Sequence, residues 1–242
     1  MIVLSIGTSH PWNVSGVGRD LVVGALRGAR VFTAIAAVSA QDARGVRALH
    51  PIPHDIFRAQ LAALPWEAAG GVRIGALAAV ENVRAVSAAL RARPALPAVV
   101  DPVFSASRGG ELAEPAARLA IRDELATLPN VILTPNLDEA AALLGSHPIA
   151  REAVGDAAAA LQLRGALAVL VKGGHLTDGD PIDALATSSG VELFVGPRIA
   201  GEMHGTGCTL AMALACELAR GTPLSEAVRE SRTFVRAEIA RH

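Results

Sequence analysis

The sequence predicts an α/β fold in which helices cover both faces of a mostly parallel central sheet. Two observations support this fold class. Short apolar runs alternate with longer segments, rich in alanine and leucine, whose apolar residues recur at helical spacing. The chain has 242 residues, enough to bury the core of one large α/β domain. We therefore expect residues 1–242 to form a single domain.

The expected elements follow from these two periodicities. The apolar runs predict strands at residues 2–6, 31–38, 72–75, 97–101, 130–133 and 167–171. The helical spacing predicts helices at residues 81–93, 111–127, 137–144, 151–163, 207–220 and about 225–240. Between the last predicted strand and the final helices, the runs IDALAT and VELFVG flank Ser-Ser-Gly, which predicts a two-stranded hairpin.

Charge and hydropathy argue against nucleic acid and membrane partners. The formal net charge is −1, from 22 basic and 23 acidic residues, and like charges do not cluster. Hydrophobic residues make up 51%, yet nearly apolar runs such as residues 31–38 are far shorter than the ~20 residues that span a bilayer. The opening MIVLSIG has no basic leader and no cleavage pattern, so it predicts a first strand. We expect a cytoplasmic protein.

The two cysteines, Cys208 and Cys216, fall on one predicted helix. Eight helical residues separate them by roughly 12 Å, beyond the ~7 Å that a disulfide bridges. We therefore expect no disulfide and no thiolate metal cluster. Cys216 is interpreted as a small packing residue.

Polar side chains follow three of the predicted strands. Asp101 comes directly after one strand, Asn136 and Glu139 follow the next, and Lys172 follows the third. In an open parallel sheet the ligand site lies beyond the carboxyl ends of the strands, so these groups should meet at one edge. Each alone could be a turn, a helix cap or a solvated charge. Together, carboxylates and a lysine are typical of a site for Mg²⁺ and a polyphosphate.

A Gly-Thr-Gly-Cys turn precedes the helix predicted at 207–220. Gly205 and Gly207 allow a tight turn with exposed N–H groups, and the positive end of the helix dipole adds to them, which favours an anion site. The same dipole is expected to favour the thiolate of Cys208. An ordinary turn followed by a small residue is the alternative. The sequence has no GxxxxGK[ST] motif and no complete dinucleotide-binding glycine pattern.

These stretches together resemble a known family. GTGCT opening a late helix, DPV after a strand, TPNLDEAAALLG and VLVKGGH resemble the hydroxymethylpyrimidine and phosphomethylpyrimidine kinases of thiamin biosynthesis. The resemblance runs in order from the first strand to about residue 221. AQDARGV and HPIP fall where that family has a flap over the substrate. The resemblance implies a ribokinase-like three-layer fold and ATP-dependent phosphorylation of a pyrimidine and its monophosphate.

The resemblance implies an anion hole at the turn, with the cysteine in place of the aspartate base of most ribokinase-like sugar kinases. The implied catalytic residues are Gly205, Thr206, Gly207, Cys208 and Lys172. Cys208 would lie closest to the hydroxymethyl group of the substrate.

It also implies roles for the strand-end residues. Asp101 and Glu139 would organise Mg²⁺ directly or through water. Asn136, Glu139 and Thr206 would position the nucleotide, and Lys172 would bind phosphate charge. ATP and Mg²⁺ are thus the expected cofactors, and a homodimer is the expected assembly.

On the substrate side, Asp20 in GVGRDL and Gln41 in SAQDARGV match the residues that the family uses to hold the aminopyrimidine. An acid and an amide supply the acceptors and the donor that such a ring edge needs. The resemblance also places Leu77 and Val103 among the substrate-binding residues.

The chain departs from the family pattern at two places. Its first loop, GTSHPWNVSGVGRDLV, is about one residue longer and has Trp12 and Asn13 where small residues are usual. The family's KTGML segment is replaced by RIGAL at 73–77. Two other functions stay open: a pyridoxal kinase, whose substrate is also a hydroxymethyl-bearing aromatic ring, and a non-catalytic domain of the same fold that senses a pyrimidine.

Overall fold

The protein is described by a computed structural model that covers the whole chain except residues 43, 107–108, 175, 177–178, 202 and 242. Ala43 and His175, which stand in two of the motifs above, lie outside the described residues. One nine-stranded sheet runs through the molecule in the order β3-β2-β1-β4-β5-β6-β7-β8-β9. Its strands are β1 Ile2–Ser9, β2 Arg30–Asp42, β3 Gly45–Pro51, β4 Gly71–Ile74, β5 Ala98–Val100, β6 Val131–Leu133, β7 Ala168–Val171, β8 Ile182–Thr187 and β9 Gly190–Val195.

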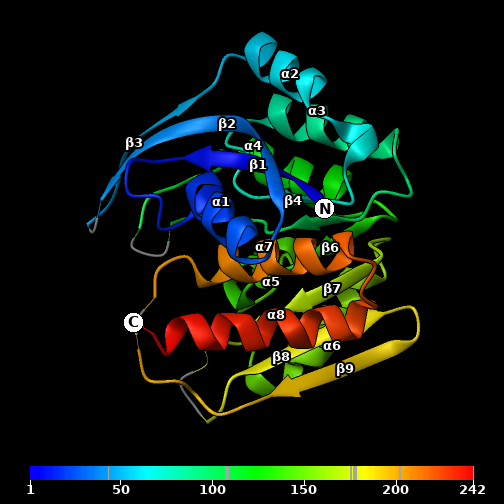
Figure 1. Ribbon diagram of the computed structural model, residues 1–242. Coiled ribbons are helices and arrows are strands. Elements are labelled where there is room, and N and C mark those ends of the chain that lie inside the picture. The colour runs from blue at the N-terminus through cyan, green and yellow to red at the C-terminus, as the bar shows by residue number, and fades with distance from the viewer. Residues whose placement is uncertain (43, 107–108, 175, 177–178, 202, 242) are drawn as a thin grey trace.

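The helices lie in two layers on either side of this sheet (Figure 1). The α-helices are α1 Gly16–Leu26, α2 His54–Ala63, α3 Val80–Arg91, α4 Pro115–Ala120, α5 Leu137–Leu144, α6 Val154–Gln162, α7 Thr206–Ala219 and α8 Leu224–Ile239. Two 3₁₀ turns, η1 Trp66–Ala68 and η3 Arg151–Ala153, and a π-helical turn, η2 Ile121–Leu125, complete the described elements. Helix, sheet and helix therefore make three layers, as the resemblance implied.

Each face of the sheet has its own hydrophobic core. The larger core includes Leu4 and Ile6 of β1 and most of the buried apolar residues of α2 to α6, whereas Val3 packs in the smaller core with α1, α7 and α8. Adjacent residues of a strand point to opposite faces. A strand covered on both faces is therefore mostly apolar, which explains the apolar runs of the central strands; Ser5 in β1 and Arg73 in β4 are buried exceptions.

The parallel part of the sheet comprises β2, β1, β4, β5, β6 and β7, paired in that order. β3 and β8 run antiparallel to their neighbours, and β8 and β9 form the predicted hairpin across residues 182–195. All six parallel strands that the sequence predicted are present. Their carboxyl ends meet at the left-hand edge of Figure 1.

Sequence reasoning missed the helices α1 and α2, the strand β3 and the short 3₁₀ turn η1. α1 has the sequence GVGRDLVVGAL, and its glycines lower helix propensity. Close packing requires one of these glycines, because a Cβ at Gly24 would lie 2.2 Å from Cγ2 of Val31 in β2. Contact with the sheet thus outweighs the weak helix propensity. β3 pairs with the end of β2, so the region that resembles the family's flap is a β-hairpin here.

Two predicted helices have different bounds. The helix expected at 111–127 is α4, which begins with Pro115 in its first turn and continues as the π-helical turn η2. The helix expected at 151–163 begins with the 3₁₀ turn η3 and continues as α6. The predicted helices over 207–220 and 225–240 are confirmed within one residue by α7 and α8.

α7 is buried over nine consecutive residues, from Thr209 to Glu217. It approaches the sheet so closely that a Cβ at Gly71 of β4 would lie 2.8 Å from the carbonyl oxygen of Ala215. Buried packing of this kind holds a helix and its first turn in one place. Within the part of the chain that the structure describes, no helix combines the length and the apolarity needed to cross a bilayer.

Candidate active site

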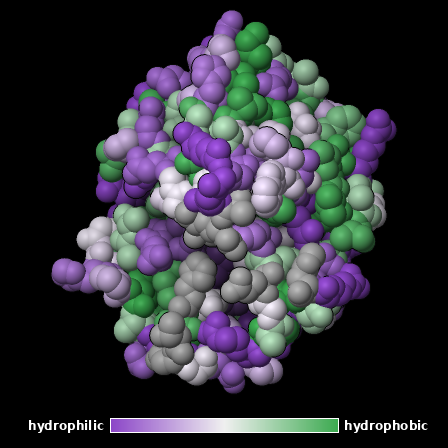
Figure 2. Space-filling model, turned by 90° about the vertical axis from the view of Figure 1, so that its left-hand side faces the viewer, coloured by the Kyte–Doolittle hydropathy of each residue, from purple (hydrophilic) through white to green (hydrophobic). Residues whose placement is uncertain are grey.

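The strand-end residues predicted from the sequence do meet at the carboxyl edge of the sheet. Asp101 follows β5, Asn136 follows β6 and Lys172 follows β7. Asn136 and Lys172 form an isolated parallel bridge, and the Lys172 backbone N–H donates to the Pro135 carbonyl at 2.8 Å. Figure 2 shows this side of the molecule, with a hollow near its centre and hydrophilic residues exposed above and below it.

Lys172 and Asp101 form the central ion pair of this edge. The Lys172 ammonium donates to Oδ1 of Asp101 at 2.7 Å, and both side chains are largely buried. Burial alone would lower the pKa of Lys172, but the carboxylates of Asp101 and Glu139 outweigh it and raise that pKa. Lys172 is therefore a permanent positive charge at physiological pH.

Asn136 and Glu139 begin α5 with a reciprocal capping box. The Asn136 side chain accepts from the Glu139 backbone N–H, and a Glu139 carboxylate oxygen accepts from the Asn136 backbone N–H, both at 2.8 Å. Burial raises the pKa of Glu139 to about 7, opposed by Lys172 and assisted by Asp101. The residue therefore caps the helix and also adds to the charge cluster, and it is buried, unlike the solvated charge that was its structural alternative.

The Gly-Thr-Gly-Cys turn lies directly against that ion pair. Gly205 has φ of +74°, and a Cβ there would lie 2.2 Å from the Val14 carbonyl oxygen, so the position requires glycine. α7 starts at Thr206. A Cβ at Gly207 would lie 3.1 Å from Nζ of Lys172. The first backbone N–H groups of α7 and the lysine therefore face one space, an arrangement suited to an anion.

Cys208 lies in the first turn of α7 and is half-buried. The prediction that the helix dipole favours its thiolate is wrong: burial raises the pKa of Cys208 and outweighs the opposing effects of Arg73 and of the hydrogen bond from the Gly16 backbone N–H. The thiol is thus mainly protonated at neutral pH. Cys216 is also a free thiol and lies in the smaller core, where burial raises its pKa to about 12, so its predicted packing role is confirmed.

Arg73 is a site residue to which sequence reasoning gave no role. It stands in β4, is fully buried, and forms ion pairs with Asp20 at 3.1 Å and with Asp101 at 3.3 Å. Charged residues are almost never fully buried without a partner. A lone arginine within a buried strand was therefore the signal that could have identified it.

Asp20 is also fully buried. Its Oδ2 accepts from the Ser5 hydroxyl at 2.6 Å and pairs with Arg73. Burial raises the pKa of Asp20 to about 6, although Arg73 and Ser5 oppose the rise. Because the carboxylate is fully buried, its predicted contact with a substrate ring stays a prediction that requires a neighbouring group to move.

The other predicted substrate residues are spread along the same edge. Gln41 is partly exposed near the end of β2, opposite Val46 in the hairpin, and Val103 is partly exposed two residues after Asp101. Leu77 is fully buried in the larger core and presents no surface to a ligand in this arrangement. The substrate roles of these three stay predictions.

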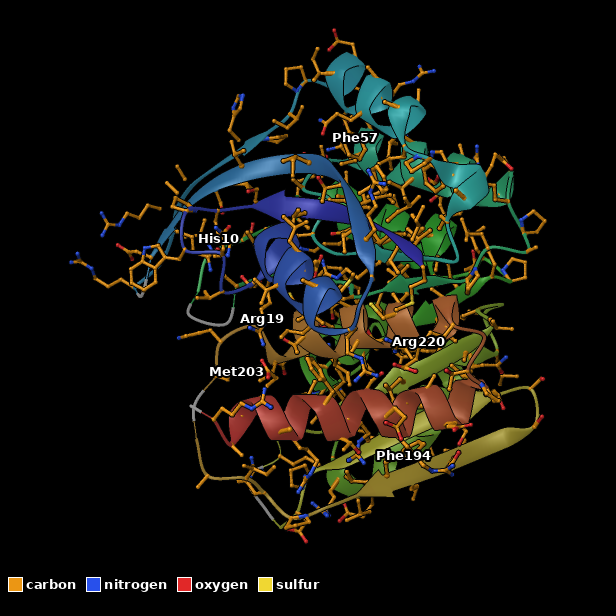
Figure 3. All side chains as sticks on the ribbon, viewed as in Figure 1. His10, Arg19, Phe57, Phe194, Met203 and Arg220 are labelled. Carbon is orange, nitrogen blue, oxygen red and sulfur yellow. The ribbon has the colours of Figure 1, made fainter. Side chains whose placement is uncertain are left out.

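The first loop is held by its own side chains. Nε2 of His10 lies 2.9 Å from the Ser15 hydroxyl, Asn13 has φ of +52°, and Trp12 is 55% exposed. At the other side of the loop, Arg19 of α1 donates to Thr209 and Glu238, both at 2.9 Å, and thereby joins α1 to α7 and α8 (Figure 3). The carbonyl of Val14 in this loop lies against Gly205, so the loop borders the Gly-Thr-Gly-Cys turn.

The residues suit a magnesium ion held mostly by phosphate and water. In the described part of the chain, no three carboxylate, histidine or cysteine groups gather closely enough to form a metal cage. Asp101 and Glu139 nevertheless place two carboxylates at the edge of the sheet beside Lys172. Mg²⁺ commonly binds through one or two carboxylates and completes its shell with waters and substrate phosphates.

The chain matches one family of known proteins over most of its length. Residues 12–242 match the family model for phosphomethylpyrimidine kinase. The chain belongs to the phosphomethylpyrimidine kinase family. This confirms the family resemblance and, with it, the predicted class of phosphotransferases.

Two relatives show how far the likeness extends. A hydroxymethylpyrimidine/phosphomethylpyrimidine kinase of Rhizobium meliloti is 37% identical over 242 residues, which cover 99% of this chain and 90% of that protein. The thiamine biosynthesis bifunctional protein ThiED of Geobacter sulfurreducens is 35% identical over 242 residues, or 98% of this chain. The chain spans 49% of that longer protein.

Solved structures of the phosphomethylpyrimidine kinase family and of pyridoxal kinases share the fold. A phosphomethylpyrimidine kinase from Clostridium difficile superposes with a TM-score of 0.85 at 27% identity, covering 99% of both chains. Bacillus subtilis pyridoxal kinase in an ADP complex superposes with a TM-score of 0.89 at 27% identity, covering 99% of this chain and 91% of that one. The predicted ribokinase-like fold is confirmed.

Proposed function

We propose that the protein transfers the γ-phosphoryl group of ATP to 4-amino-5-hydroxymethyl-2-methylpyrimidine, and then phosphorylates the monophosphate, in thiamin biosynthesis. The observation that carries this proposal is the position of the Gly-Thr-Gly-Cys turn against the Lys172–Asp101 ion pair. A sensor of pyrimidines has no need for such a site. The family match and the names of the relatives support the same reaction.

The phosphate side of the reaction rests on charge neutralisation and positioning. The backbone N–H groups of Gly207 and Cys208 and the ammonium of Lys172 would hold the transferring group, where its negative charge is spread over three oxygens. Such donors accelerate transfer because they are fixed before the reaction begins. Asn136 and Thr206 would orient the rest of the nucleotide.

Asp101 and Glu139 would hold Mg²⁺, directly or through water. The ion supplies neutralisation of phosphate charge. Lys172 pairs with Asp101 at 2.7 Å, so binding of phosphates would draw its ammonium from one anion to another. Before the nucleotide binds, the positive charge of Lys172 is therefore balanced by the carboxylate of Asp101.

On the acceptor side, Cys208 would lie beside the hydroxymethyl group and Gln41 would contact the ring. During transfer the acceptor oxygen bonds to phosphorus while the bond from phosphorus to the ADP oxygen breaks, and the hydroxyl proton leaves. Cys208 would take this proton as the thiolate, which Arg73 favours and burial disfavours. We therefore expect turnover to rise with pH above neutrality.

Pyridoxal is a second candidate acceptor. The overall likeness to Bacillus subtilis pyridoxal kinase is as high as the likeness to the phosphomethylpyrimidine kinase from Clostridium difficile. The first loop of this chain, with Trp12 and Asn13, also differs from the usual pyrimidine kinase pattern. We further propose a cytoplasmic homodimer, on the family alone, which light scattering of the purified protein would test.

The experiment that tests the proposed function measures ADP release with ATP and Mg²⁺ in four parallel assays. These contain hydroxymethylpyrimidine, its monophosphate, pyridoxal, or no acceptor. The highest kcat/KM on the two pyrimidines is expected. A higher kcat/KM on pyridoxal would assign the protein to the vitamin B6 kinases, and tight pyrimidine binding without ADP release would indicate a sensor.

A further inference from the structure

Arg73 is the largest fully buried side chain among the described residues. It extends from β4 into space that two glycines leave open. A Cβ at Gly75 would lie 2.2 Å from Nη1 of Arg73, and a Cβ at Gly7 would lie 3.5 Å from the same atom. Glycine at position 75 is therefore required for the guanidinium to lie where it does.

The guanidinium joins two acids that come from different elements. Nη1 lies 3.1 Å from Oδ2 of Asp20, in α1, and Nη2 donates to Oδ2 of Asp101, after β5, at 3.3 Å. The other oxygen of Asp101 accepts from Lys172 at 2.7 Å. Each oxygen of Asp101 is therefore assigned to a different cation, which fixes the rotation of the carboxylate.

Stability is a weak reason for such a charge in a core. Nε of Arg73 has no hydrogen-bond partner within the described part of the chain, and Nη1 is only within ion-pair range of Asp20. The guanidinium also interacts with the Cys208 thiol of the turn. Well-packed apolar residues often replace buried ion pairs with no loss of stability. An incompletely satisfied guanidinium beside the transfer site therefore indicates a role in the site.

The position of Arg73 relative to the anion turn indicates what that role is. A Cβ at Gly207 would lie 3.8 Å from both carboxylate oxygens of Asp101 and 3.1 Å from Nζ of Lys172. The turn, the lysine and Asp101 are thus in mutual contact range, and a rotation of Asp101 would displace Lys172 from the turn. Arg73 contacts Asp101 from the side opposite to Lys172, since it takes the other oxygen.

We propose that Arg73 is a positioning residue of the phosphoryl-transfer site: it holds Asp101 so that Oδ1 faces Lys172 and the turn. This inference rests on the proposed function. The family's KTGML pattern has lysine at this position, so the charge alone serves there, whereas in this chain the planar fork of Arg73 bridges Asp20 and Asp101. Arg73 therefore affects the site both by orienting the carboxylate of Asp101 and by the positive charge of its own guanidinium.

The test compares Arg73→Met and Arg73→Lys with Arg27→Met. Arg27 is a matched control because it caps α1 at the end far from the site and pairs with Glu217, another buried carboxylate. We expect Arg73→Met to lower kcat by about 10²-fold, the cost typical of a small misplacement of reacting groups, and Arg73→Lys to recover only part of it. Arg27→Met should change kcat less than about twofold, whatever it does to the unfolding midpoint.

A double-mutant cycle with Asp20→Asn separates positioning from charge balance. If Arg73 acts through Asp101, Arg73→Met lowers kcat by the same factor in the Asp20→Asn background as in the parent, and by the same factor at every pH. A factor that shrinks as the pH rises would show that Arg73 acts on the Cys208 thiolate instead, and would overturn the proposal. Removing one buried cation and one buried acid together also keeps the net charge of the core, which protects folding. A loss of kcat that disappears in that background would show that Arg73 only balances Asp20 and would overturn the proposal. Full activity of Arg73→Met would overturn it too.

Failure of this inference is distinct from failure of the proposed function. The turnover of the parent on the pyrimidines reports on the proposed function. The ratio between variant and parent, measured with whichever acceptor the parent phosphorylates, reports on Arg73. A normal ratio in a pyridoxal kinase would thus reject the role of Arg73, whereas a low ratio there would support it.

Discussion

Replacement of Gly207 by alanine should make the protein slightly more stable and far less active. Gly207 is the second residue of α7 and its φ is not positive, so alanine fits its backbone. An alanine in a helix is favoured over glycine by about 0.5–1 kcal/mol. The added methyl would lie 3.1 Å from Nζ of Lys172, whose flexible end can move by a few tenths of an ångström. That methyl would occupy the space assigned to a phosphate oxygen.

The expected loss of kcat is about 10²–10³-fold, as for removal of one anion-hole donor. ADP release gives kcat, and urea unfolding gives the free energy of unfolding. Gly155→Ala is the matched control, because Gly155 is the second residue of α6 and its added Cβ would make only ordinary contacts, at 3.6 Å from Val191 and 3.8 Å from Leu193. The control should keep full activity. If Gly207→Ala turned over as fast as Gly155→Ala, the turn would not be the anion hole.

Three further predictions concern the charges of the site. Lys172→Ala should lower kcat by about 10²–10³-fold. The protein should still fold, because Asp101 keeps its ion pair with Arg73. Measurement of kcat together with urea unfolding tests both expectations, and near-normal turnover would exclude Lys172 from the reaction. Burial raises the pKa of Glu139 from 4.5 to about 7 in the folded protein. The folded state therefore favours the protonated carboxyl, and this contribution to the free energy of unfolding is fully present below pH 4.5 and is lost as the pH rises through 7. The free energy of unfolding should therefore decrease across that window, and less steeply in Glu139→Gln, which keeps a side chain able to cap α5; an identical slope in the two proteins would reject the raised pKa. Removal of divalent metal with EDTA should abolish turnover, and added Mg²⁺ should restore the turnover. The unfolding midpoint should not change, because the described residues form no metal cage. Metal-independent turnover would contradict the assigned roles of Asp101 and Glu139.

The sequence predicted the sheet well because its central strands are covered on both faces. Such strands are mostly apolar, Asp101 and Lys172 stand immediately after two of them, and Asn136 stands three residues after a third. The rule that ligands bind at the carboxyl ends of parallel strands then predicts that these residues lie at one edge. The Lys172–Asp101 ion pair confirms that placement.

What the sequence could not predict depends on packing between distant segments. α1 was missed because its glycines weaken the helical pattern, and only the close approach of Val31 explains Gly24. The pKa of Cys208 was predicted in the wrong direction, because the dipole of α7 can be read from the sequence but the extent of burial cannot. The ion pairs of Arg73 join residues 28 and 53 positions away along the chain, and local spacing carries no trace of them.

The central claim, that the Gly-Thr-Gly-Cys turn and the strand-end charges phosphorylate a hydroxymethylpyrimidine, is tested most directly by comparing the parent with Cys208→Ala. Both proteins would be given ATP, Mg²⁺ and hydroxymethylpyrimidine, and ADP and the pyrimidine monophosphate would be quantified together. We predict equal amounts of the two products from the parent and turnover at least about 10²-fold slower from the variant, with unchanged unfolding. Equal turnover by the two proteins, or ADP release without a phosphorylated pyrimidine, would contradict the claim.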